Sequence, residues 1–141
     1  MSRSISVDDL PVPAASAVEW TFLDAGWTAL TDSDGTWLAS LLRGLVEVVL
    51  VTNATVPGLR RLESCAEVLG RDVLGVVVGP PVKRWPRPVK VAASALPSRL
   101  RLVDFPLDPR LQVTGLTPDP LPASLLKAAQ SILTLLRKEP S

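Results

Sequence analysis

The feature that most constrains this fold is a set of short apolar, β-branched runs separated by longer amphipathic patterns. Residues 47–52 (EVVLVT), 73–78 (VLGVVV) and 100–105 (LRLVDF) are typical of strands, and residues 18–23 (VEWTFL) predict another. The near-continuous apolar run 47–52 is expected to be buried on both faces. Strands that alternate with helices form parallel sheets. The sequence therefore predicts an α/β fold, with a small, mostly parallel sheet of about four strands and helices on both faces.

Apolar residues at helical spacing predict helices over residues 36–45, 57–69, 89–95 and 123–138. Pro57 suits the first turn of its helix, and Gly70 is suited to end it. The last helix is expected to bury one face, made by Leu125, Leu126, Ala129, Ile132, Leu133 and Leu136. The turn-rich stretch before that helix contains several prolines and predicts no regular structure.

The length of 141 residues corresponds to about one domain. Residues 1–17 are polar and then rich in proline and alanine, which predicts a flexible N-terminal arm before a single domain over residues 18–141. No apolar run approaches the roughly 20 residues that a membrane-spanning helix needs, so we expect a cytoplasmic protein without membrane contact. The single cysteine, Cys65, is expected to be a buried structural residue.

Two compositional facts bear on chemistry. The chain contains no histidine, the commonest general base and metal ligand, so neither a catalytic triad nor a metal site is predicted. Charge is also divided unevenly: residues 1–79 hold 5 Lys+Arg against 10 Asp+Glu, and residues 80–141 hold 10 against 4. A basic segment in the second half could meet phosphate or an acidic partner, or could be a solvated face.

Three stretches carry a resemblance to the ParA/MinD-like P-loop ATPases. Residues 21–26 (TFLDAG) resemble that family's strand ending in a magnesium-side aspartate and a switch glycine. Residues 48–52 with 57–61 resemble the next strand and its helix, and residues 105–111 (FPLDPRL) with Gly115 resemble the late loop that packs on the nucleotide base. The resemblance implies the fold of one half of a P-loop NTPase.

The family's Gly-rich phosphate loop ending in Gly-Lys-Ser/Thr has no counterpart in the sequence, because none of the four lysines follows a glycine. The resemblance thus implies Asp24, Gly26 and Asp108 as relics of a nucleotide and metal site, without a cofactor. Turn chemistry is the alternative for Asp24. No catalytic residue is assigned, and the chain is not expected to hydrolyse ATP or to act as an enzyme.

The most unusual segment is residues 83–90 (KRWPRPVK). Lys83, Arg84, Arg87 and Lys90 surround Trp85, and two prolines hold the segment extended. One interpretation is phosphate contact with a stacking indole, as in nucleic-acid binding. The other packs Trp85 onto the domain or onto a partner subunit, with the cations as a rim.

Together these patterns predict a non-catalytic ParA/MinD-like interaction module that acts through protein–protein contacts. A protein partner or self-association is expected, and the partner could be an ATPase that supplies the missing phosphate loop. The alternative is a nucleic-acid-binding accessory protein that uses the basic residues 83–90.

Overall fold

The computed structural model describes Phe22, Asp24 and residues 47–137. The chain separates into two compact units, Met1–Val46 and Glu47–Ser141. Phe22 and Asp24 have no regular secondary structure, and the rest of the predicted strand 18–23, the predicted helix 36–45 and the predicted boundary after residue 17 lie outside the described residues. The second unit therefore carries the fold described below.

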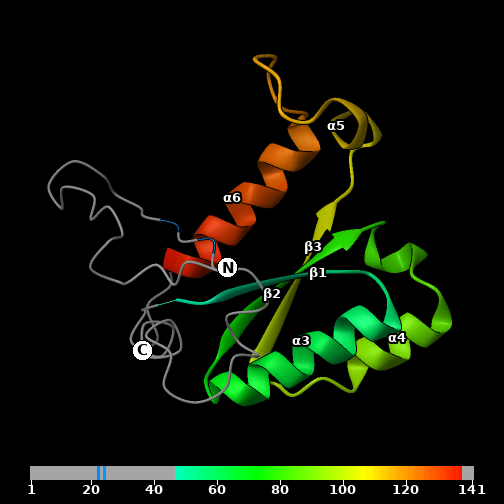
Figure 1. The fold of residues 1–141 in the computed structure, drawn as a ribbon, viewed down its shortest axis with the longest axis vertical. Coiled ribbons are helices and arrows are strands. Elements are labelled where there is room, and N and C mark those ends of the chain that lie inside the picture. Colours follow the sequence, from blue (N-terminus) through cyan, green and yellow to red (C-terminus); the bar gives the residue numbers. More distant parts are fainter. Residues whose placement is uncertain (1–21, 23, 25–46, 138–141) are drawn as a thin grey trace, which may run out of the picture. The chain divides into compact units, whose positions relative to one another are not determined.

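A parallel sheet of three strands forms the centre of the second unit (Figure 1). The strands are β1 (Val49–Asn53), β2 (Val73–Gly79) and β3 (Leu100–Pro106), with β2 in the middle. Val76 of β2 lies opposite Val51 of β1 and Val103 of β3. The parallel α/β prediction is confirmed, whereas the expected fourth strand is not among the residues that the structure describes.

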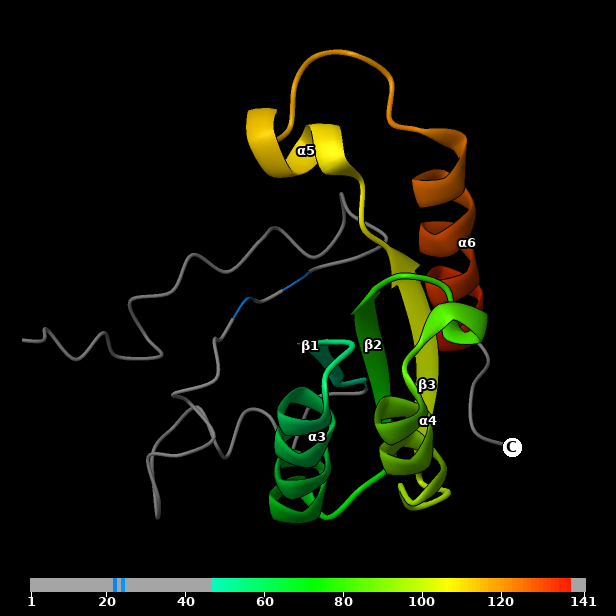
Figure 2. The ribbon, with the colours of Figure 1, turned by 90° about the vertical axis from the view of Figure 1, so that its right-hand side faces the viewer.

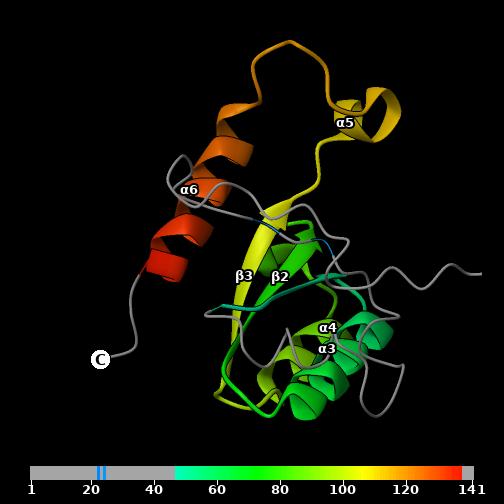
Figure 3. The same cartoon turned by 60° about the vertical axis from the view of Figure 1, so that its left-hand side comes forward.

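Helices cover both faces of this sheet. The helix α3 (Val56–Leu69) connects β1 to β2, and the short 3-10 helix η2 (Val82–Arg84) with α4 (Arg87–Ser94) connects β2 to β3. The two helices α3 and α4 lie side by side on one face (Figure 2). After β3 the chain forms α5 (Pro109–Thr114) and α6 (Ala123–Arg137), and α6 packs on β3 from the other face (Figure 3).

Local sequence determines where α3 begins and ends. The Thr55 Oγ1 accepts a hydrogen bond from the Gly58 backbone N–H at 3.1 Å, and Pro57 occupies the first turn. At the other end, Gly70 has φ 63° and its N–H donates to the carbonyls of Ala66 and Glu67. The predicted role of Gly70 as a helix stop is confirmed.

The core lies between α3 and the central strand. Leu59 and Leu62 of α3 and Leu74 and Val77 of β2 are fully buried. A Cβ atom at Gly75 would come within 2.9 Å of Leu62 Cδ2 and 2.8 Å of Leu102 Cδ2. Glycine at this position therefore lets α3 approach the sheet closely.

Three details of the prediction are wrong. The strand β1 is not buried on both faces, since Val49 and Val51 are exposed while Leu50 is buried. The helix α6 packs on β3, at the opposite edge of the sheet, and so does not cover these two valines. On α6, Leu126 is 47% exposed and does not belong to the buried face with Leu125 and Leu136. The helix α5 was not predicted, since its proline-rich surroundings are typical of turns.

Candidate functional site

The carboxyl ends of the three strands meet at one edge of the sheet. The register places Asn53 of β1 opposite Val78 of β2, and Gly79 of β2 opposite Pro106 of β3. The Ala54 N–H donates to the Val78 carbonyl at 3.1 Å, and a Cβ at Gly79 would lie 2.9 Å from the Ala54 Cβ. Open α/β sheets place their binding sites at this edge. The loops that leave it are therefore the candidate site.

Trp85 anchors the loop that follows β2. Its side chain is 5% exposed, and its indole Nε1–H donates to the Pro80 carbonyl at 2.8 Å. The backbone N–H of Trp85 donates to the Val82 carbonyl, and that of Arg84 to the Pro81 carbonyl. The indole thus packs within its own domain, which was one of the two placements that the sequence left open. It offers no stacking surface to a ligand.

The cations around Trp85 remain outside the core. All four cations are exposed, namely Lys83, Arg84, Arg87 and Lys90. We call these four residues the basic platform. The Lys90 Nζ donates to the Lys83 carbonyl at 3.0 Å and so ties α4 to η2. No acidic residue occurs between Pro80 and Val103 in the sequence. The basic platform is therefore positively charged, and a hydrogen bond links its two helical segments.

A second candidate region follows β3. Asp108 caps α5, because its Oδ1 accepts from the N–H groups of Arg110 (2.8 Å) and Leu111 (3.1 Å). The Arg110 Nε lies 3.9 Å from the same oxygen. Further along the loop, the Thr117 hydroxyl donates to Asp119 Oδ2 at 3.2 Å. The resemblance to a nucleotide-base loop implies a ligand role for Asp108, whereas the role that this structure shows for its carboxylate is the cap of α5.

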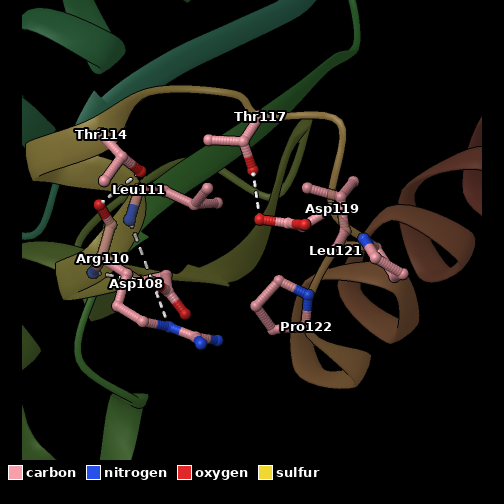
Figure 4. Close-up of a pocket in the computed structure, with 9 residues that line it drawn as sticks. Asp108, Arg110, Leu111, Thr114, Thr117, Asp119, Leu121 and Pro122 are labelled. Atoms are coloured by element: carbon pink, nitrogen blue, oxygen red, sulfur yellow. Dashed lines mark hydrogen bonds and ion pairs between the residues drawn. The ribbon is translucent and has the colours of Figure 1, made fainter.

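A small cavity lies between α5 and the loop that leads to α6 (Figure 4). Its volume is about 170 Å³, and its walls combine Asp108, Arg110 and Asp119 with the apolar Leu111 and Leu121. Sequence reasoning singled out Asp108 but missed Arg110, Thr117 and Asp119. The local signal for them was the run of prolines and small polar residues, which is typical of turns that bring nearby side chains together.

Large apolar side chains are exposed along the segment that contains α5 and this cavity. Val113 is 87% exposed and Leu116 82% exposed, and Leu107 and Leu121 are also exposed. We call these four residues the α5 surface. Clustered exposed apolar residues mark contact sites more often than single ones do.

The remaining predicted site residues belong to different parts of the chain. Asp24 is exposed and lies in the first unit, whereas Asp108 lies in the second, and Gly26 lies outside the described residues. Among the residues that the structure describes, no group of three Cys, Asp or Glu side chains forms a metal-binding cluster. The relic nucleotide site therefore stays a prediction.

Cys65 is buried on α3, as the sequence predicts. Burial raises the pKa of its thiol, and the nearby Arg61 guanidinium lowers this pKa by a smaller amount. A thiol with a raised pKa is a poor nucleophile at neutral pH. Cys65 therefore belongs to the core.

Within the described part of the chain, no helix combines the length and apolar character needed to cross a membrane. Comparisons with protein-family models, with curated proteins and with solved structures return no match. The candidate site therefore rests on the geometry of the carboxyl edge alone.

Proposed function

We propose that this chain is an interaction module that acts through protein–protein contacts, and that the α5 surface joins two copies of it. The observation that carries the proposal is the exposure of Val113 and Leu116, which are 87% and 82% exposed. Burying a leucine or valine side chain contributes about 1.5–3 kcal/mol. Two copies that cover these side chains therefore gain free energy that offsets part of the cost of association.

The charges around the α5 surface favour a second copy as the partner. A contact with two-fold symmetry needs a surface that is complementary to itself. Arg110 and Asp119 line the same cavity as Leu121. The Arg110 side chain is 81% exposed, and Asp119 is exposed as well. In a symmetric dimer, Arg110 of one copy can meet Asp119 of the other, while the apolar residues between them are buried.

Sedimentation velocity over a range of protein concentrations tests this proposal. We expect the wild-type protein to dimerise, and Leu116→Asp combined with Val113→Asp to raise the dimer dissociation constant at least about tenfold, which corresponds to about 1.4 kcal/mol. Val68→Asp is the matched control, since Val68 is also exposed but lies on α3. A wild-type monomer at tens of micromolar, or equal weakening by Val68→Asp, would contradict the proposal.

We also keep the ParA/MinD-like resemblance as part of the proposal. Three parallel strands in consecutive order support it, together with the position of Asp108 after β3 at the carboxyl edge. On this basis the chain is a non-hydrolysing relative of these ATPases that works in the cytoplasm.

A further inference from the structure

The basic platform differs from an ordinary solvated charge run in the hydrogen bonds that close its backbone. Trp85 fixes η2 through its bond to the Pro80 carbonyl, and Lys90 fixes the start of α4 through its bond to the Lys83 carbonyl. Two further backbone bonds close the turn at Arg84 and Trp85. A partner that binds here orders little of this backbone, so less binding free energy is lost to conformational entropy.

The charge of Arg87 in the basic platform lies where it does not stabilise the fold. Arg87 is the first residue of α4, and this helix has no acidic residue in its first turn and no side-chain cap. A helix N-terminus carries a partial positive charge, which disfavours cations by about 0.3–1 kcal/mol each. The neighbouring α3 has no acidic residue in its first turn either. This end of the α3–α4 layer therefore favours negatively charged groups.

Apolar side chains lie among these cations. Val82 is 46% exposed and Val91 59% exposed, and Pro81, Pro86 and Pro88 are exposed as well. The phosphate backbone of a duplex has no apolar side chain to bury against them, and the buried Trp85 leaves no aromatic surface for unpaired bases. A protein segment that carries both carboxylates and apolar side chains complements both kinds of group.

We propose that the basic platform, with Val82 and Val91, binds an acidic amphipathic segment of a partner protein. Carboxylates of the partner contact Lys83, Arg84 and Arg87, and its apolar side chains cover the two valines. Trp85 acts as the internal support of this surface and does not touch the partner. The surface is distinct from the α5 surface, so this proposal goes beyond self-association and is tested separately from it.

The test uses the full chain and a fluorescent peptide of Glu and Leu in amphipathic helical order, with a 20-base-pair duplex DNA as the competing probe. Fluorescence anisotropy measures both affinities at about 0.15 M salt. We expect saturable peptide binding that is tighter than duplex binding. Replacing Lys83, Arg84 and Arg87 by Glu should weaken peptide binding at least about tenfold, in line with the loss of interfacial charge pairs.

Val91→Ser separates a protein partner from a phosphate partner. It should weaken peptide binding about threefold, since it removes one partly buried apolar contact. Val68→Ser is the control, because the exposed fraction of Val68 (61%) is similar to that of Val91 (59%) but Val68 lies on α3. Lys127→Glu, an exposed cation on α6, is the charge control. Both controls should leave the peptide affinity unchanged within about twofold, a difference of 0.4 kcal/mol.

Three outcomes would overturn the proposal: no saturable peptide binding, duplex binding tighter than peptide binding, or equal effects of Val91→Ser and Val68→Ser. Circular dichroism spectra of all variants establish that they are folded. The double variant Leu116→Asp/Val113→Asp should keep full peptide affinity. Failure of the dimer and failure of peptide binding are therefore distinguishable.

Discussion

The two loop regions at the carboxyl edge of the sheet are built in opposite ways. The segment after β2 buries its large aromatic residue, Trp85, and exposes its cations. The segment after β3 exposes its large apolar residues, such as Val113 and Leu116, and holds Asp108 in hydrogen bonds as a helix cap. The first region is therefore a fixed, charged surface, and the second is an apolar surface on a short helix. The difference shows that one edge of a small sheet can offer two surfaces for chemically different partners.

The largest effect is expected when Trp85, the buried anchor of the first region, is replaced. Trp85→Ala should lower the free energy of unfolding by about 3–5 kcal/mol, because it leaves a cavity in place of a buried indole. Leu116→Ala, in the second region, should change the free energy of unfolding of the monomer by no more than about 0.5 kcal/mol, because Leu116 is exposed in the single chain. Urea denaturation followed by circular dichroism measures both values.

A second variant of Trp85 separates its packing from its hydrogen bond. Trp85→Phe keeps most of the apolar volume but removes the donor to the Pro80 carbonyl. The lost hydrogen bond should lower the free energy of unfolding by about 1 kcal/mol, in addition to any loss from changed packing. If Trp85→Ala were no more destabilising than Leu116→Ala, this would contradict the view that the region after β2 depends on a buried anchor and the region after β3 does not.

A smaller effect is expected at the cap of α5. Asp108→Ala should cost about 1 kcal/mol, because the N–H groups of Arg110 and Leu111 lose their acceptor. Asp108→Asn keeps an acceptor oxygen and should cost much less. Hydrogen exchange should show faster exchange in α5 and unchanged exchange in α4 for the alanine variant. Equal losses in the two variants would mean that Asp108 acts through its charge and not as a cap.

The smallest expected effect depends on pH and concerns α3, which packs beside α4. Burial raises the pKa of Cys65 above its ordinary value of about 8.5. The unfolded chain therefore ionises first as the pH rises. Stability is unaffected below about pH 8.5 and falls as the pH approaches the raised pKa of the folded state.

Urea denaturation between pH 7.5 and 10 measures this fall for the wild-type protein and for Cys65→Ala. The alanine variant should lack the part of the fall that comes from the thiol. Parallel curves for the two proteins would show that Cys65 ionises equally in the folded and unfolded states.

The sequence by itself determined the three parallel strands and the boundaries of α3. Runs such as residues 73–78 are apolar at every position, and only a central strand covered on both faces can bury them. The cap at Thr55 and the stop at Gly70 depend on contacts within a few residues, so the local sequence specifies them. The same holds for the burial of Cys65, which follows from its place on the apolar side of α3.

Only the tertiary structure decided the roles of the residues at the carboxyl edge. The sequence around Trp85 left open whether the indole packs onto its own domain or contacts a partner, and in the structure it donates a hydrogen bond to the Pro80 carbonyl of its own domain. Val49 and Val51 are exposed because α6 packs on β3, which is separated from β1 by the central strand. Arg110 and Asp119 share a cavity because α5 forms where prolines predicted a turn. In each case the outcome depends on how turns and helices pack in three dimensions, which periodicity and composition do not specify.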